Sequence, residues 1–200
     1  MNETAIVILA GGSSSRLGVP KQLLPFGDSL LIQAIAKVAI SSKPAVVVVV
    51  TGANSQAISA ALDDMRVDLV YNKNWQEGMA SSIVAAVAKL AELKCETENV
   101  ILAVCDQPFV SKDLFVKMVE KHNITGKGIV ACSYAGTVGT PALFHRKYFA
   151  DLQNLKGTEG AKGLLKKLKH DLSFVDFPAG CVDIDTPEDY KNALLNIDGY

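Results

Sequence analysis

The sequence lacks three features that would point to common protein classes. Its four cysteines, Cys95, Cys105, Cys132 and Cys181, form no Cys-x-x-Cys pair. This argues against a zinc site or a disulfide framework, so we expect reduced, mostly buried thiols in a cytoplasmic protein, with Cys105 a small buried side chain. Lysine and arginine number 20 against 21 acidic residues, and no apolar run approaches the roughly 20 residues of a membrane span. We therefore expect no nucleic-acid partner and no membrane partner. The N-terminus has no charged region followed by a cleavable apolar stretch, so we also expect no signal peptide.

Two common phosphate-binding motifs are also missing. A Walker A loop needs Gly-x-x-x-x-Gly-Lys-Ser/Thr, but Lys21 stands between Pro20 and Gln22, and no Gly-x-Gly-x-x-Gly fingerprint occurs. Instead, an apolar run ending at Ala10 is followed at once by the polar stretch Gly11–Arg16. Glycines let backbone N–H groups approach an anion closely, and Arg16 and Lys21 add positive charge beside them. This loop is predicted to bind a triphosphate where a strand hands over to a helix; the alternative is an ordinary polar turn.

Strand-like and helix-like patterns alternate along nearly the whole chain. The apolar run Thr4–Ala10 and the five consecutive valines within Ala45–Thr51 are typical of parallel strands covered by helices on both faces. Ser29–Ser41 has helical apolar spacing behind a possible Asp28 cap. We therefore expect a single domain over residues 1–200, with a three-layer, Rossmann-like α/β fold and a mostly parallel central sheet. The further expected elements are helices at Gln56–Leu62, Met79–Leu93, Lys112–His122, Gly160–His170 and Pro187–Asn196, the last capped by Thr186, strands at Val67–Tyr71, Val100–Val104, Ile129–Cys132, Pro141–Phe144 and Leu172–Phe177, and a hairpin or lid at Ser133–Pro141.

A second polar loop, Asn72–Ser82, lies between an expected strand and an expected helix. Gly78 allows a tight approach to a ligand, and Ser81 and Ser82 fall in the first helical turn, where backbone N–H groups have no helical partner. One interpretation is that the loop binds a base, a ribose or an acceptor phosphate. The other is that Trp75 anchors the loop by packing and the serines only start the helix.

Carboxylates follow two further strand ends. Asp106 comes directly after an apolar strand, and Asp183 and Asp185 alternate onto one side of an extended segment. Carboxylate oxygens are good Mg²⁺ ligands, and Mg²⁺ in turn holds phosphates. We predict a Mg²⁺ site built from Asp106 with Asp183 or Asp185. Asp106 could instead cap the turn before Pro108, and the segment after Asp185 reads as a helix start at Thr186, so Asp183 is the better second ligand.

Taken in this order, the motifs resemble the MobA-like NTP transferases, and among them most closely the molybdenum cofactor cytidylyltransferases. The resemblance extends from about Ile6 to Leu195, nearly the whole chain. It is carried by the loop Leu9–Lys21, the Asn-x-x-Trp-x-x-Gly-Met-x-Ser pattern of Asn72–Ser82, the Cys-Asp-Gln-Pro of Cys105–Pro108, Gly139–Pro141 with Phe144, and Asp183–Asp189.

The resemblance implies a GT-A-like fold and a Mg²⁺-dependent nucleotidyltransferase. Such an enzyme would transfer CMP or GMP from CTP or GTP to the terminal phosphate of molybdopterin and release pyrophosphate. Asp106 would hold the metal, while Arg16 and Lys21 would neutralise the leaving group, and these three are the expected catalytic residues. The chemistry needs positioning and charge stabilisation rather than a protein nucleophile. The implied nucleotide-binding residues are Leu9, Ala10, Gly11, Gly12, Ser13, Ser14, Arg16, Lys21, Asn72, Gly78, Met79, Ser81 and Ser82.

The chain departs from the family pattern at three positions that concern substrates. Gly11 stands where cytidylyl enzymes usually carry alanine and guanylyl enzymes carry glycine, which leaves CTP and GTP both open. Thr140 and Thr158 replace a usual histidine and a usual aspartate, which leaves the acceptor open. The alternatives are a transferase acting on a sugar or polyol phosphate, and an accessory protein that delivers the cofactor to a molybdenum hydroxylase, its potential partner.

Overall fold

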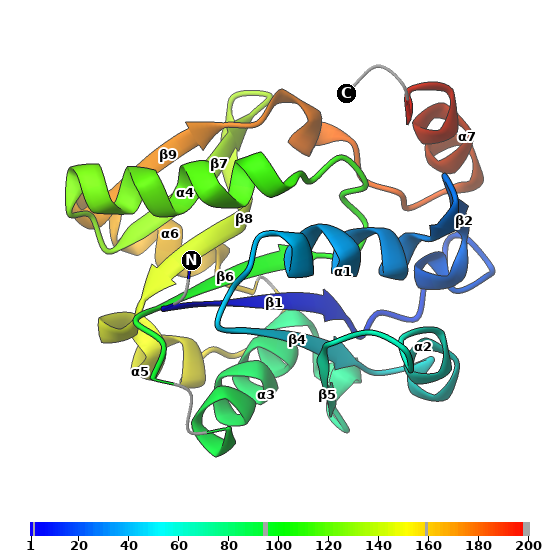
Figure 1. The fold of residues 1–200 in the computed structure, drawn as a ribbon, viewed down its shortest axis with the longest axis horizontal. Coiled ribbons are helices and arrows are strands. Elements are labelled where there is room, and N and C mark those ends of the chain that lie inside the picture. Colours follow the sequence, from blue (N-terminus) through cyan, green and yellow to red (C-terminus); the bar gives the residue numbers. More distant parts are fainter. Residues whose placement is uncertain (2, 94–95, 159, 198–200) are drawn as a thin grey trace.

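A seven-stranded sheet runs through the centre of the structure (Figure 1). The computed structural model describes residues 1, 3–93, 96–158 and 160–197, so Cys95 lies outside the described residues. The strand order is β5-β4-β1-β6-β8-β7-β9, and β8 runs antiparallel to both of its neighbours while the other pairs are parallel. The expected mostly parallel sheet is confirmed. The strands are β1 (Thr4–Ala10), β2 (Pro25–Phe26), β3 (Ser29–Leu30), β4 (Val46–Thr51), β5 (Asp68–Tyr71), β6 (Asn99–Val104), β7 (Ile129–Tyr134), β8 (Thr137–His145) and β9 (Leu172–Asp176), with β2 and β3 forming a separate small hairpin.

Helices cover both faces of the sheet and complete three layers. They are α1 (Leu31–Ser41), α2 (Ser55–Ala61), α3 (Met79–Glu92), α4 (Lys112–Thr125), α5 (Phe149–Gln153), α6 (Lys162–Lys167) and α7 (Pro187–Leu195). Apolar side chains of α1, α2, α4 and α7 share one core with one face of the sheet, and those of α3, α5 and α6 share a second core with the other face.

The valine run of β4 explains why this strand lies inside the sheet. Val47 and Val49 pack into one core, whereas Val48 and Val50 pack into the other, and all four are buried. A β-branched side chain suits a pleated surface and is stabilised by burial on either face. The strand pairs in parallel with β1 and β5, as its sequence predicts.

Two local expectations were wrong, and one short helix was missed. Asp28 does not cap α1, because Ser29 and Leu30 pair with β2, and the Gln33 side chain instead accepts a hydrogen bond from the Leu30 N–H at 3.0 Å. The helix expected over Gly160–His170 is interrupted: α6 ends at Lys167, and a 3₁₀ turn follows at Lys169–Asp171. The short helix α5 was missed, since five residues are too few to show a helical period.

Two other expectations are confirmed. Thr186 caps α7, accepting a hydrogen bond from the Asp189 N–H at 3.2 Å, with Pro187 at the first helical position. Most of Ser133–Pro141 belongs to the hairpin that joins β7 and β8, with the turn at Ala135 and Gly136.

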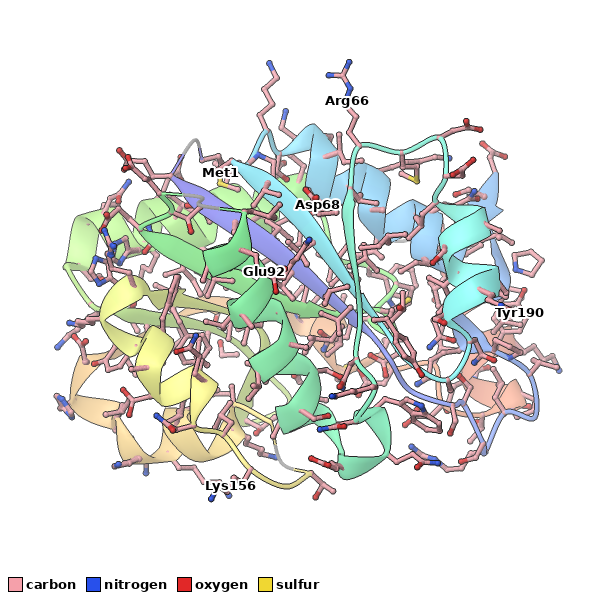
Figure 2. The ribbon with its side chains drawn as sticks, turned by 90° about the horizontal axis from the view of Figure 1, so that it is seen from below. Met1, Arg66, Asp68, Glu92, Lys156 and Tyr190 are labelled. Carbon is pink, nitrogen blue, oxygen red and sulfur yellow. The ribbon has the colours of Figure 1, made fainter. Side chains whose placement is uncertain are left out.

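The carboxyl ends of the parallel strands converge at one end of the molecule. In Figure 2, Met1, near the start of β1, and Tyr190, in α7, mark opposite ends. The loop that follows β1 lies at the end marked by Tyr190, together with α2 and α7 (Figure 1). Ligands of open α/β sheets bind at this edge. No helix among the described residues combines the length and the apolar content that crossing a membrane requires.

Asp171 supports the opposite, amino-terminal edge of the sheet, just before β9. Its carboxylate accepts hydrogen bonds from the Tyr148 hydroxyl at 2.6 Å and the Lys147 ammonium at 2.7 Å, and its side chain is only 15% exposed. Burial alone would raise the pKa of Asp171, but the hydrogen bonds from Lys147, Tyr148 and the Gly128 N–H outweigh it and hold the pKa below its usual range. The ionised carboxylate is therefore the form that stabilises the fold.

We expect the Asp171→Asn variant to lose about 2 kcal/mol of unfolding free energy at pH 7. Because the folded-state pKa of Asp171 lies below the unfolded value, its contribution is present above about pH 4 and fades as the pH falls further. Urea unfolding at pH 7 and at pH 3 measures both effects, with the exposed Asp151→Asn as control. An equal loss at the two pH values would contradict the role of the ionised carboxylate.

Candidate active site

The loop after β1 is shaped by two polar side chains of its own. Ser14 adopts a left-handed backbone conformation, with a φ of 56°. Its carbonyl accepts hydrogen bonds from the N–H groups of Leu17 at 3.0 Å and Gly18 at 3.2 Å. Its hydroxyl accepts one from the Lys21 N–H at 3.0 Å. Ser14 therefore holds the turn that brings Lys21 back toward the sheet edge.

The side chain of Gln22 holds the same loop from its buried side. It is 2% exposed, and its side-chain amide donates hydrogen bonds to the carbonyls of Ala10 and Gly12, both at 2.9 Å. The carbonyl groups of Ala10 and Gly12 therefore point toward the interior of the protein. Sequence reasoning missed Gln22; the available signal was a lone polar side chain between the basic Lys21 and the apolar Leu23.

We expect the Gln22→Leu variant to lose about 2 kcal/mol of unfolding free energy, because two carbonyls lose their buried donor. Faster hydrogen exchange at the amides of the Gly11–Ser14 stretch should accompany this loss. Chemical unfolding and exchange mass spectrometry measure the two effects, and the exposed Gln76→Leu serves as control. Unchanged exchange in the loop would show that Gln22 does not organise it.

Lys21, Arg16 and two aspartates form one network at the sheet edge. The Lys21 Nζ lies 2.9 Å from Asp106 Oδ2 and 2.7 Å from Asp185 Oδ1, and Arg16 Nη2 lies 2.7 Å from Asp185 Oδ2. The residues that follow β1, those that follow β6 and those that precede α7 thus meet at one point. Arg16, Lys21 and Asp106 lie on one face of the molecule rather than on separate ones.

A backbone hydrogen bond explains how the two acidic segments come together. The Ile184 N–H donates to the Asp106 carbonyl at 3.0 Å, and the Ile184 side chain is fully buried. Because side chains alternate along an extended segment, a buried Ile184 directs Asp183 and Asp185 to the other side, toward the site.

The charges in this network shift one another's pKa values. Burial alone would lower the pKa of Lys21, but the charges and hydrogen bonds of Asp106 and Asp185 raise it. Burial opposes ionisation of Asp185, yet Lys21 and Arg16 lower its pKa. Asp183 forms no ion pair with any described residue, so partial desolvation, helped by the charges of Asp106 and Asp185 and opposed by that of Lys21, raises its pKa to about 6. Asp183 and Asp106 are thus a pair of carboxylates that a cation would stabilise.

Two clefts adjoin this network. The glycine-loop cleft encloses about 300 Å³. The second, which we call the hairpin cleft, encloses about 330 Å³ and is lined by residues of the hairpin that joins β7 and β8, among them Tyr134, Thr137 and Thr140. Leu9 and Met79 line both clefts, while Lys21 and Asp106 line the first and Asp183 the second. A ligand in one cleft would therefore meet a ligand in the other near the carboxylates. The glycine-loop cleft is lined by Leu9, Ala10, Gly11, Gly12, Lys21, Gln22, Trp75, Gly78, Met79, Ser82, Val104, Cys105, Asp106 and Thr158.

Several residues expected to contact nucleotide do not line the glycine-loop cleft itself. Asn72 is buried and donates hydrogen bonds to the hydroxyls of Ser81 at 2.8 Å and Ser82 at 3.0 Å, and its side-chain carbonyl accepts one from the Asn74 N–H. Asn72 and Ser81 line a separate cavity beyond α3 rather than the glycine-loop cleft. They brace the start of α3, whereas Ser82 and Trp75 face the cleft. Ser13, Ser14 and Arg16 are also not among the residues that line the cleft.

Gly52 is a second residue that sequence reasoning missed. A Cβ placed on it would fall 2.7 Å from the Trp75 Cβ and 2.9 Å from the Gly11 Cα, and would overlap the Gly11 carbonyl oxygen. Only a glycine allows the loop after β4 to pack this closely against the loop after β1. The signal in the sequence was a glycine directly after the valine strand.

The cysteine beside this site, Cys105, is protected from ionisation by its burial. Cys105 lines the glycine-loop cleft but is buried, and burial raises its pKa far above the usual value. It is the small buried side chain that the sequence predicts. Within the described ranges, Cys132 is likewise buried and Cys181 is exposed, both as free thiols.

Among the described residues, no three histidine, cysteine or acidic side chains already form a metal-binding group. The nearest arrangement is Asp106 with Asp183, since Asp185 directs its two oxygens to Lys21 and Arg16. Two carboxylates beside an open cleft suit a divalent cation that takes its remaining ligands from phosphates and water.

The fold and the site define an α/β protein with a glycine-rich loop, basic side chains and carboxylates at the carboxyl edge of its sheet. Residues 6–172 match the family model described as the MobA-like NTP transferase domain. The chain therefore belongs to the MobA-like NTP transferase family and is a nucleotidyltransferase by family.

Sequence relatives span nearly the whole chain. The nicotine blue oxidoreductase of Paenarthrobacter nicotinovorans is 28% identical over 92% of this chain and 89% of its own length. The molybdenum cofactor cytidylyltransferase of Escherichia coli is 22% identical over 96% of both chains.

A solved structure agrees with the fold. Rv0371c of Mycobacterium tuberculosis superimposes with a TM-score of 0.84 at 29% identity, covering 96% of this chain and 97% of its own. A structure of Rv0371c in complex with manganese gives a TM-score of 0.80 at 27% identity, covering 96% of this chain and 98% of its own.

Proposed function

We propose that this protein transfers CMP or GMP from CTP or GTP to the terminal phosphate of a molybdopterin-type acceptor and releases pyrophosphate. One observation carries the proposal. Basic side chains of the glycine loop and carboxylates from two other segments converge where two clefts meet. A transfer between two phosphates needs two adjoining binding spaces and cationic charge between them.

The nucleotide would occupy the glycine-loop cleft. Its triphosphate would lie against the loop, with Lys21 and Arg16 on the β- and γ-phosphates, which leave as pyrophosphate. Lys21 is only 12% exposed in its side chain, so its charge acts with little screening by water. Arg16 is 70% exposed and can turn from Asp185 to the phosphates at small cost.

The acceptor would occupy the hairpin cleft, with its phosphate toward Asp183. An oxygen of that phosphate attacks the α-phosphorus of the nucleotide, and the bond between this phosphorus and the oxygen bridging to the β-phosphate breaks. In the product, a diphosphate links the nucleoside to the acceptor, and pyrophosphate leaves. Tyr134, Thr137 and Thr140 line the same cleft and would contact the body of the acceptor.

Asp106 with Asp183 would hold a divalent cation, which we assign as Mg²⁺. The manganese complex of Rv0371c, a similar structure, supports the proposal of a divalent metal here. When bound, the ion would neutralise charge on the phosphates that Asp106 and Asp183 face. Asp185 is the less suitable ligand, because both its oxygens already bind basic side chains.

Gly11 bears on the choice of nucleotide. A Cβ added there would lie 3.2 Å from the Ser82 hydroxyl, tight against the wall of the glycine-loop cleft. The glycine thus lets the loop after β1 pack closely against Ser82, and since this contact does not select a base, both CTP and GTP are candidate substrates.

An assay of pyrophosphate release tests the proposal directly. The purified protein is incubated with Mg²⁺, one of the four common NTPs, and molybdopterin or a panel of sugar and polyol phosphates. We expect release that depends on molybdopterin, with CTP or GTP. Release with sugar phosphates alone would refute the molybdopterin assignment. Binding of cofactor without release by any NTP would favour delivery to a molybdenum hydroxylase.

A further inference from the structure

We propose that Asp185 is an internal counter-ion that holds the Arg16 and Lys21 side chains in place and exchanges them with the nucleotide's phosphates, rather than a metal ligand. This inference rests on the proposed function, since it assigns the phosphates of a nucleotide as the competing anion. It makes Asp185 a positioning residue for Arg16 and Lys21 and a group that promotes the release of pyrophosphate from that site.

The contacts of Asp185 are those of a counter-ion. Oδ1 lies 2.7 Å from the Lys21 Nζ and Oδ2 lies 2.7 Å from the Arg16 Nη2, so each oxygen holds one cation. A metal ligand would need an oxygen directed to the metal, and two adjacent cations repel a third. Asp106, by contrast, uses one oxygen in its 2.9 Å contact with Lys21.

The backbone that carries Asp185 is firmly held. The Asp189 carboxylate accepts hydrogen bonds from the N–H groups of Thr186 at 2.8 Å and Asp185 at 3.3 Å. The Tyr190 hydroxyl donates to the Pro25 carbonyl at 2.7 Å, which ties α7 to the chain just after Lys21. Asp185 is thus a fixed point, while Arg16 is exposed and able to move.

A fixed carboxylate between these two cations has two consequences. Without nucleotide, it keeps Arg16 and Lys21 ordered and discourages smaller anions such as inorganic phosphate. After transfer, it competes with pyrophosphate for the same cations and favours release of this product. Removing its charge should therefore tighten the binding of polyphosphate anions and slow their departure.

Binding measured without metal separates this role from metal ligation. Isothermal titration in EDTA compares pyrophosphate, CTP and GTP on the wild type, Asp185→Asn, Asp185→Glu and Glu188→Gln. We expect Asp185→Asn to bind pyrophosphate about threefold to tenfold more tightly than the wild type, since a partly exposed ion pair is lost. Asp185→Glu should return toward the wild type. Glu188→Gln, which removes an exposed charge from the first turn of α7, should bind pyrophosphate as tightly as the wild type does.

Steady-state kinetics with Mg²⁺ supply a second readout. Asp185→Asn should lower the KM for nucleotide and also lower kcat, as slower pyrophosphate release requires. In an Arg16→Met background, the tightening caused by Asp185→Asn should shrink. Thermal unfolding of each variant establishes that it is folded.

Metal ligation gives the opposite pattern. Unchanged binding in EDTA together with weaker binding and a raised KM with Mg²⁺ would overturn the inference and make Asp185 a metal ligand. A wild type that releases no pyrophosphate with any NTP would instead refute the proposed function. The EDTA titration with pyrophosphate distinguishes the two failures, because it requires no turnover.

Discussion

The Asp106→Asn variant should release pyrophosphate at least about a thousandfold more slowly than the wild type while remaining folded, a loss of about 4 kcal/mol in transition-state stabilisation. Asp106 is the carboxylate that lines the glycine-loop cleft and contacts Lys21 at 2.9 Å. Asparagine keeps the shape of the side chain but removes the charge that would hold a divalent cation. Pyrophosphate release at saturating nucleotide and varied Mg²⁺ measures the effect.

The control is Glu188→Gln, which removes one exposed negative charge from the first turn of α7. It should retain full activity and full Mg²⁺ affinity. If Asp106→Asn keeps more than about a tenth of the wild-type rate at saturating Mg²⁺, the carboxylate is not needed for the chemistry, and the metal assignment to Asp106 and Asp183 is wrong.

We expect the Lys21→Met variant to lose about a hundredfold to a thousandfold in kcat, because the leaving pyrophosphate loses its least solvated cation. Methionine preserves much of the apolar stem of lysine, so the loss reports the charge. The same change leaves Asp106 and Asp185 facing each other without the ammonium group between them, and we expect a stability loss of about 1–2 kcal/mol. Steady-state kinetics and chemical unfolding measure the two effects.

The double variant Lys21→Met/Asp185→Asn separates the two consequences. It should recover most of the lost stability, since one of the two carboxylates that Lys21 had neutralised is removed, but none of the lost activity. Recovery of activity in the double variant would show that Lys21 acts only by neutralising Asp185 and not on the nucleotide. Lys73→Met, an exposed charge loss outside the cleft, is the matched single control.

The sequence alone located the sheet and the edge at which the site lies. The valines of β4 pack into both cores, and Gly11, Asp106 and Asp183 each follow an apolar strand or alternate onto one side of an extended segment. These signals are local, because the residue types at adjacent positions determine both the burial of a strand on its two faces and the alternation of its side chains. The order of the motifs also pointed to the correct family.

Only the tertiary structure decided how the site's side chains are partnered. Lys21 and Asp185 are 164 positions apart, and whether Asp185 faces a metal or a lysine depends on how the start of α7 docks beside the loop after β1. The close packing of Gly52 against Gly11 and the burial of Gln22 under two carbonyls likewise arise between segments. Asn72 and Ser81 fit a family motif, and the structure shows that they hydrogen-bond to each other and line a cavity beside α3. A sequence pattern places a residue at an edge of a sheet, but contact distances there depend on the packing of separate segments, which no single segment encodes.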